Sequence, residues 1–261
     1  MGDCMSDTTT HGEVSDSLIH ATDLHFWEVV TNPLRLLNKR FLGNLNVWLR
    51  RRHVYHTDLA VAFADAFCET GIRTVLLGGD LSSTATDREF RQAAHFASML
   101  RDRGHTIIAI PGNHDVYTFE SVRARRFERY FGPFLPGKEL PCRIQLPGGV
   151  PLVLVPTVRP NLLSSRGHIG FRDIESTAEL VSSAPSGPVL VAAHYPLLRT
   201  TYAYRTTYGR GLHNGGLLRE SLGRTGRRVL YVAGHVHRFS HVQDPEHSNL
   251  VHVTTGALFY S

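Results

Sequence analysis

The sequence contains little cysteine and no long apolar run. Its three cysteines, Cys4, Cys68 and Cys142, are far apart and odd in number. They therefore form neither a disulfide framework nor a Cys-x-x-Cys metal site. This pattern indicates a reducing compartment and predicts a cytoplasmic protein. No stretch approaches the roughly 18 apolar residues of a membrane-spanning helix, so the sequence predicts none.

Residues 1–16 are polar and lack the apolar core of a secretory signal. We predict a disordered tail there, with Met5 as an alternative start. The residues Met1, Gly2 and Ser6 also match a short myristoylation pattern, which has meaning only in a eukaryote. The remainder, 17–261, has neither repeats nor an obvious linker and is long enough to bury one core, so it is predicted to be a single domain.

Lysine is scarce, since Lys39 and Lys138 are the only two, but the formal net charge is +5 and there are 16 histidines. A modest basic excess suits anionic substrates, nucleic acid or an anionic membrane surface, and does not choose between them. The sequence contains no recognisable module that reads DNA or RNA. Nucleic acid therefore stays an open alternative partner.

Acidic residues are absent from a cationic segment that spans residues 29–57. Apolar residues recur in it at three- and four-residue spacing, which is typical of an amphipathic helix. These residues are Leu34, Leu37, Phe41, Leu45 and Trp48. The pair Gly43-Asn44 predicts a break in this helix.

The cationic segment allows two interpretations. One is a flap beside the functional site that binds a membrane through residues 33–52, or holds an acyl or aromatic substrate. The other is a helix packed in the core, with its basic face in solvent.

Apolar runs repeatedly end in residues that can bind a metal. The run Val229–Val232 leads into Gly234-His235-Val236-His237. In extended backbone, residues i and i+2 project from the same side, so both imidazoles would be presented together. Open α/β sheets keep their ligand sites at this carboxyl edge.

Four other predicted strands end in the same way. Their runs and polar ends are 17–22 before Asp23-Leu24-His25, 73–77 before Gly79-Asp80, 106–110 before Gly112-Asn113-His114-Asp115, and 188–193 before His194. Between them the apolar patterns predict helices at 59–70, 87–103, 120–131, 174–182 and 217–222, a hairpin of 143–146 with 152–155, a last strand at 250–254, and loops at 161–170 and 199–216. We expect the Arg-rich face of helix 120–131 to be solvated.

Together the strand ends present two carboxylates, one amide and four imidazoles. They are Asp23, His25, Asp80, Asn113, His194, His235 and His237. This set is too large for one tetrahedral zinc ion. It suits two cations about 3.5–4 Å apart that share a carboxylate. Mixed nitrogen and oxygen ligands suit Mn, Fe, Zn, Co or Ni.

The predicted chemistry follows from charge. Two divalent ions bring four positive charges and two aspartates return two negative ones, so the centre favours a phosphate ester as substrate. A metal-bridging hydroxide would attack phosphorus in line. His114 would protonate the leaving oxygen or stabilise developing charge, and Asp115 would orient His114. The sequence thus predicts a two-metal phosphohydrolase.

These five motifs, in this order, resemble those of the calcineurin-like metallophosphoesterase superfamily, over about residues 17–256. The resemblance implies an α/β fold, a four-layer α/β/β/α sandwich of two mixed sheets flanked by helices. It also implies a role for each ligand: Asp23, His25 and His237 at the first metal, Asn113, His194 and His235 at the second, Asp80 as the bridge and His114 as the catalytic histidine.

The subfamily is less defined. The Asn-His-Asp triplet and the His-x-Pro at His194 resemble bacterial cyclic-nucleotide phosphodiesterases, although Tyr195 stands where those often have a second histidine. This resemblance implies a phosphodiesterase rather than a monoesterase. The alternative is a membrane-associated nucleotide-lipid pyrophosphatase similar to UDP-diacylglucosamine hydrolases, whose apolar insertions the cationic segment imitates; their better-known branch has Arg in place of His114. A non-catalytic scaffold is the least favoured alternative.

Overall fold

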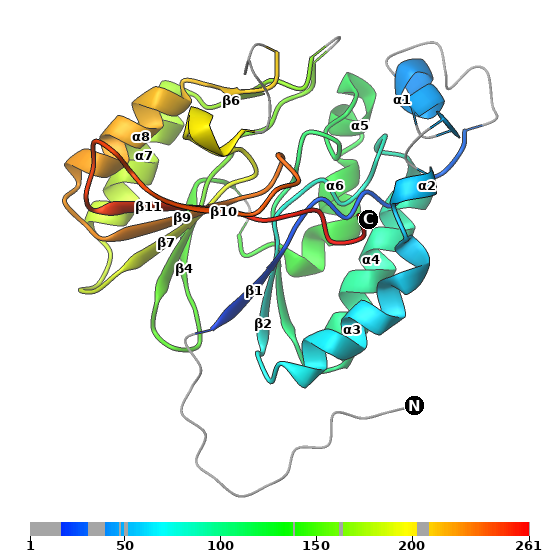
Figure 1. Cartoon of the computed structure of the whole chain (residues 1–261), viewed down its shortest axis with the longest axis horizontal. Helices are drawn as coiled ribbons and strands as arrows, with labels where there is room; N and C mark the ends of the chain where they lie inside the picture. The colour runs from blue at the N-terminus through cyan, green and yellow to red at the C-terminus, as the bar shows by residue number, and fades with distance from the viewer. Residues whose placement is uncertain are drawn as a thin grey trace, which may run out of the picture.

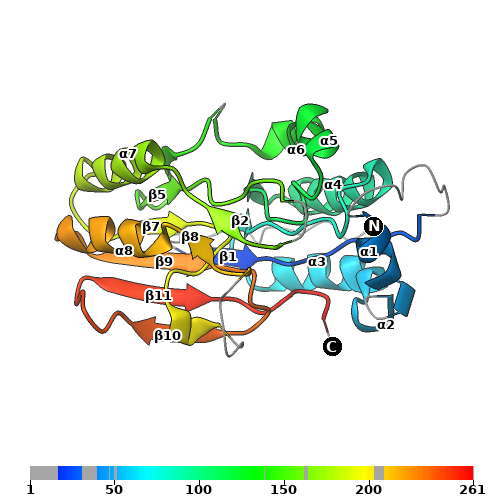
Figure 2. The same cartoon turned by 90° about the horizontal axis from the view of Figure 1, so that it is seen from above.

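The computed structural model describes residues 17–30, 40–46, 48–49, 52–137, 139–161, 164–202 and 209–260. The predicted disordered tail, 1–16, and half of the predicted membrane-contacting stretch, 33–52, lie outside these residues. Within them the chain forms two main sheets that pack face to face, each covered by helices on its outer side, as Figures 1 and 2 show.

The smaller sheet has three parallel strands, in the order β1 (Leu18–Ala21), β2 (Thr74–Leu77) and β3 (Thr106–Ala109). Its outer face is covered by α3 (Ala60–Glu69), α4 (Asp87–Asp102) and α6 (Arg126–Phe131). Side chains alternate across a strand. Val75 and Leu77 therefore pack under these helices, whereas Leu76 lies in a second apolar cluster on the other face.

The larger sheet has six strands. In spatial order they are β10 (Ser240–Gln243), β11 (Leu250–Thr254), β9 (Val229–Ala233), β7 (Val189–Ala192), β5 (Pro151–Leu154) and β4 (Cys142–Gln145). The β4–β5 and β10–β11 pairs are antiparallel and the other pairs are parallel. Helices α7 (Phe171–Ser182) and α8 (Gly215–Arg224) cover its outer face.

The apolar layer between the sheets joins them face to face. Leu190 and Ala192 of β7 belong to the same cluster as Leu76 of β2, whereas Val189 and Val191 pack under α7 and α8. The four-layer α/β/β/α architecture is thereby confirmed. Among the described residues only the larger sheet is mixed, so the prediction of two mixed sheets holds for that sheet alone.

Most predicted elements are present, including the hairpin, which is β4–β5. The predicted helix 120–131 is divided into α5 (Phe119–Arg123) and α6, because Arg125 takes a left-handed φ of 47°. The expectation of a wholly solvated arginine face is also wrong. The Arg126 side chain is mostly buried and donates from its Nη2 to Glu120 Oε1 at 2.7 Å and from its Nε to Asp87 Oδ2 at 3.2 Å.

Three strands were not predicted: β10, β6 (Gly167–His168) and β8 (Leu212–His213). The last two pair in parallel within segments that the sequence predicts as loops. Two-residue strands contain no readable period. Short 3₁₀ helices complete the described elements at Thr57–Leu59, Gly132–Phe134 and Arg199–Thr201.

The described part of the cationic segment forms α1 (Arg40–Asn46) and α2 (Arg52–Val54). The predicted break at Gly43-Asn44 is wrong, because tertiary contacts support the helix there. A Cβ on Gly43 would lie 2.8 Å from the Tyr117 hydroxyl, and the Asn44 amide hydrogen-bonds both backbone groups of Val30, at 2.7 and 3.0 Å.

Large apolar side chains of this segment point outward. Phe41 is 55% exposed, Leu45 43%, Trp48 49% and Leu49 59%. The interpretation of a core-packed helix is therefore wrong for these four residues; Leu34 and Leu37 lie outside the described residues. Among the described helices, none is both long enough and apolar enough to cross a bilayer.

Candidate metal centre

All seven predicted ligands meet at the carboxyl edge that the two sheets share. They follow the strands directly: Asp23 and His25 after β1, Asp80 after β2, Asn113 after β3, His194 after β7, and His235 and His237 after β9. This placement is a consequence of parallel pairing, which brings the carboxyl ends of β1, β2 and β3, and of β7 and β9, to one side.

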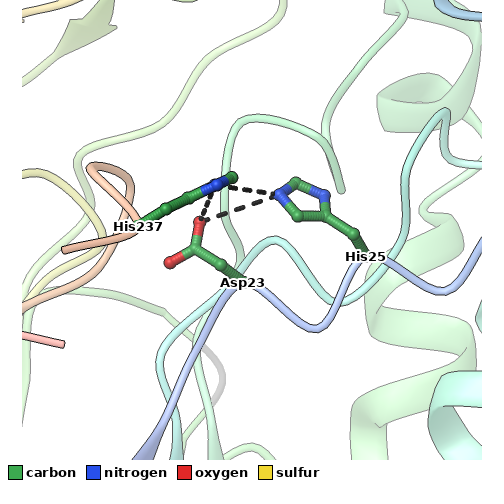
Figure 3. Close-up of side chains that lie close together, drawn as sticks. All are labelled: Asp23, His25 and His237. Atoms are coloured by element: carbon green, nitrogen blue, oxygen red, sulfur yellow. Dashed lines mark hydrogen bonds and ion pairs between the residues drawn. The ribbon is translucent and has the colours of Figure 1, made fainter. Parts of the chain in front are cut away.

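A first cluster consists of Asp23, His25 and His237 (Figure 3). Nε2 of His237 lies 3.1 Å from Asp23 Oδ1 and 3.1 Å from Nε2 of His25. Asp23 Oδ1 is buried and has no hydrogen-bond partner in the described part of the chain. An unsatisfied buried carboxylate oxygen is costly. A cation between these three donors would satisfy it, so the residues fit a divalent metal ion.

A second cluster consists of Asp80, His194 and His235, with Asn113 beside it. Nε2 of His194 lies 3.4 Å from Asp80 Oδ1 and 3.2 Å from Asn113 Oδ1. The two imidazoles are held from behind by backbone carbonyls. Nδ1 of His194 bonds to the Gly78 oxygen at 3.0 Å, and Nε2 of His235 to the Arg210 oxygen at 2.9 Å. The opposite ring nitrogens are thereby left as the ligand atoms.

Asp80 lies between the clusters. Its Oδ1 faces His194, and its Oδ2 lies 3.8 Å from Nε2 of His25. Burial alone would raise the pKa of Asp80, but the imidazoles of His194 and His114 outweigh it and hold the pKa well below its usual range. Burial alone would lower the pKa of His194, whereas the Asp80 carboxylate raises it to about 9. The two clusters are suited to two divalent ions with Asp80 in reach of both.

The backbone at the ligands is unusual. Asp23, His25, Asp80, His235 and His237 all have a positive φ, between 49° and 69°. Such conformations are uncommon for residues with a side chain and persist where the surrounding structure determines them, often at functional sites. They bend the chain sharply just after each strand, which turns the ligand side chains into one space.

His114 stands at the edge of the centre. Its backbone N–H donates to Asp80 Oδ1 at 2.7 Å, and its Nδ1 lies 2.6 Å from the Ser83 carbonyl oxygen. The ring stacks on Tyr117 with centroids 5.4 Å apart and meets His25 edge-on at 4.8 Å. These contacts place the imidazole firmly beside the Asp80 carboxylate.

The expectation that Asp115 orients His114 is wrong. The Asp115 carboxylate accepts from the backbone N–H groups of Leu81, Ser82 and Gly112, at 3.2, 2.8 and 2.8 Å, and from the Ser82 hydroxyl at 2.9 Å. Burial and the nearby Asp80 raise the pKa of Asp115 to about 7. Asp115 therefore holds the loop that follows β2, and the Ser83 carbonyl in that loop orients His114.

Sequence reasoning missed two tyrosines. The Tyr55 hydroxyl lies 3.0 Å from Nδ1 of His237, and its ring meets His25 at 4.8 Å. The Tyr195 hydroxyl donates to the Ser165 carbonyl oxygen and lies 3.1 Å from Asn113 Oδ1. Both rings are buried. Nothing local in the sequence singles out Tyr55, whereas Tyr195 had a signal in its position directly after His194.

Replacing Tyr55 with Phe is expected to weaken metal binding at the first cluster. The ring packing is retained, but the Nδ1 of His237 loses the partner that sets its tautomer and direction. Losses of about 10- to 100-fold in affinity are typical for such partners. Equilibrium dialysis with Mn²⁺, fitted to two sites, measures this. Tyr260→Phe, on a ring 6.3 Å from His237, is the control; an equal change in both variants contradicts the role of Tyr55.

Comparison with known proteins agrees with this geometry. The family model for calcineurin-like phosphoesterases matches residues 17–239. Two solved structures share the fold at 14% identity. A dimetal phosphatase from Danio rerio has a TM-score of 0.66, covering 94% of this chain and 88% of its own. The purple acid phosphatase PPD1 from yellow lupin, Lupinus luteus, has 0.59, covering 92% of this chain and 43% of its own.

The phosphopantetheinyl hydrolase PptH from Mycobacterium tuberculosis is also similar, at 14% identity and a TM-score of 0.51, covering 94% of this chain and 91% of its own. No curated protein sequence matches the chain. The fold and the paired His/Asp clusters define a metal-dependent phosphoester hydrolase. The family match spans most of the chain, which therefore belongs to the calcineurin-like phosphoesterase family.

Proposed function

We propose that the chain is a cytoplasmic phosphodiesterase with a two-metal centre, formed as a single domain by residues 17–261. The observation that carries this proposal is the position of His114. Its imidazole is held between the Ser83 carbonyl and the Tyr117 ring, next to the carboxylate that reaches both clusters. A proton donor placed there can serve the oxygen that leaves phosphorus.

The proposed ligand roles follow the two clusters. The first ion would be held by Asp23, His25 and His237, the second by Asn113, His194 and His235, and Asp80 would reach both. When bound, two such ions acidify a water and neutralise phosphoryl oxygens. Manganese is the ion we would load first, since this mixture of nitrogen and oxygen donors suits it.

His114 has a distinct task in this proposal. Its Nδ1 is engaged by the Ser83 carbonyl, so we assign proton transfer to Nε2. An alkoxide is a poor leaving group, and its protonation during cleavage is worth about 10² to 10⁴ in rate. The hydrogen bond from the His114 backbone N–H to Asp80 Oδ1 fixes the position of His114 relative to the two clusters.

Among the described residues, the two clusters contain two carboxylates, Asp23 and Asp80, because the Asp115 carboxylate is bonded to the backbone. With two divalent ions the centre would keep a positive charge, which suits an anionic phosphate ester of either kind. The feature that supports a diester rather than a monoester is the structure on both sides of the centre, where α1 lies near Tyr117 and the β6–β8 pair near His235. A diester has a group to place on each side of phosphorus.

The test compares two substrates. Protein stripped of metal and reloaded with Mn²⁺ is expected to cleave bis-p-nitrophenyl phosphate faster than p-nitrophenyl phosphate, and a chelator is expected to remove both activities. Faster monoester cleavage would contradict the diester assignment. Turnover that survives the chelator would contradict a metal-dependent reaction.

A second candidate is a nucleotide-lipid pyrophosphatase with peripheral membrane contact through residues 33–52. The observation that favours it is the exposure of Phe41 and Leu45 on α1 and of Trp48 and Leu49 beyond its end. At Gly43, α1 approaches Tyr117 and Thr84, which are near His114 and Ser83. An apolar surface next to the reacting group suits an acyl chain. In the same assay, CDP-diacylglycerol cleavage that is lost in Phe41→Glu/Trp48→Glu would favour this candidate.

A further inference from the structure

The β6–β8 pair carries a cluster of basic side chains outside the ligand set. No aspartate or glutamate occurs from Thr157 to Arg172 or from Arg199 to Arg219. Gly167 pairs with Leu212 and His168 with His213, so these two acid-free segments lie together. We call the described residues 157–161, 164–172 and 209–213 the basic ribbon. Its basic side chains include Arg159, Arg166, His168, Arg210 and His213.

Basic side chains gather in the basic ribbon. The rings of His168 and His213 stack with centroids 5.4 Å apart, and Arg166 Nη2 lies 3.0 Å from His213 Nδ1. Within the described ranges, no carboxylate forms an ion pair with Arg159, Arg166, His168 or His213. Burial, Arg159 and His213 lower the pKa of His168, and the Asp173 carboxylate opposes them. Arg159, Arg166 and His213 are exposed, so an anion can approach them.

Backbone contacts fix the basic ribbon against the second cluster. The Arg210 carbonyl accepts from His235, and the Ser165 carbonyl accepts from the Tyr195 hydroxyl. The Tyr195 ring in turn lies 4.1 Å from the His235 ring. A Cβ on Gly167 would come within 2.7 Å of the Tyr195 ring, so this close approach requires glycine. Arg166, between Ser165 and Gly167, is therefore held near the metal centre.

We propose that the basic ribbon binds a second phosphate group of the substrate, on the group attached to the reacting phosphorus. The inference rests on the proposed function for the reacting phosphate and adds the substrate class, namely phosphate esters or anhydrides that carry another phosphate. Arginine suits this task because its planar fork donates two parallel hydrogen bonds to phosphate oxygens. His213 adds a ring donor beside it.

The test measures binding of ADP and AMP to the Mn²⁺-loaded full-length chain by equilibrium dialysis. ADP has the second phosphate and AMP lacks it. In Arg166→Ala the preference for ADP over AMP is expected to fall by about tenfold, since a hydrogen bond to a charged group contributes at least that in binding. Arg91→Ala, which removes one exposed arginine from α4, is the matched control and should keep the preference of the native chain.

An unchanged preference in Arg166→Ala, or an equal fall in Arg91→Ala, overturns the inference. Absence of any ADP preference in the native chain also overturns it. The proposed function is judged separately, by cleavage of bis-p-nitrophenyl phosphate by the native chain. Lack of that cleavage together with an Arg166-dependent ADP preference would remove the phosphodiesterase and keep the anion site.

Discussion

Asp80→Asn is expected to lower kcat/KM for bis-p-nitrophenyl phosphate by about 10³-fold or more, because the carboxylate proposed to reach both ions loses its charge and metal stabilisation of the reaction is worth several kcal/mol. The fold should survive this change. An asparagine oxygen can still accept from the His114 backbone, as Asp80 Oδ1 does at 2.7 Å. Asparagine also tolerates the left-handed φ of 53° at this position.

The measurement needs two readouts. Steady-state kinetics gives the loss of activity, and thermal unfolding of the metal-free variant shows whether the fold is retained. Asp102→Asn, which alters a side chain that is 66% exposed on α4, is the control and should behave like the native chain. If Asp80→Asn turns over substrate at the native rate, the two-metal centre is not the source of the activity. Loss of activity with an unfolded chain would contradict the expectation that only charge is lost.

His114→Asn is expected to have an effect that depends on the leaving group. For a diester with an alkyl leaving group we expect kcat to fall by about 10² to 10⁴, which is the usual contribution of a general acid. For bis-p-nitrophenyl phosphate the loss should be much smaller, because p-nitrophenolate leaves without protonation. The position of the ring beside Asp80, with its Nδ1 on the Ser83 carbonyl, is the basis for this difference.

Metal content separates this role from metal binding. The variant should retain two ions per chain by elemental analysis, because the proposed ligand sets do not include His114. His95→Asn, at an exposed position on α4, is the matched control. Equal losses for both substrates would argue against a general acid, and loss of one ion would instead make His114 a ligand.

The asymmetry of the two sides of the centre bears on substrate choice. Exposed apolar side chains of α1 lie on the side of His114, and the basic ribbon is bonded to the side of His235. A substrate with an anionic part and an apolar part would match both sides. The ADP comparison and the CDP-diacylglycerol assay probe these two sides independently.

Much of the architecture was readable from local patterns. Apolar runs such as 74–77 and 189–192 are buried throughout, and continuous apolar strands are typical of parallel sheets covered on both faces. The polar residues that end these runs could be anticipated at one edge, because parallel strands place their carboxyl ends together. That is why Asp23, Asp80 and His235 were recognisable as one set before any contact was known.

Other features depend on contacts between distant segments. Tyr55 and His237 are 182 positions apart, and no periodicity connects them. Asp115 is adjacent to His114 in sequence, yet its carboxylate turns to the loop after β2, where it accepts three hydrogen bonds, and it accepts a fourth from the Gly112 N–H. The two-residue strands β6 and β8 exist because backbone groups meet, as in the 3.2 Å bond from the Gly167 N–H to the Gly211 oxygen.

The sequence by itself determined the layers, the types of donor atom and the family. The reason is that the burial of each strand depends on its own apolar residues, and the donor atoms are those of the polar residues that follow it. Only the tertiary structure decided which groups orient those donors: the Ser83 carbonyl at His114, Tyr55 at His237 and the Arg210 carbonyl at His235. It also decided that Phe41 and Leu45 of α1 point outward. The physical reason is that a hydrogen-bond partner or a packed face is selected by proximity in space, which the identity of neighbouring residues does not encode.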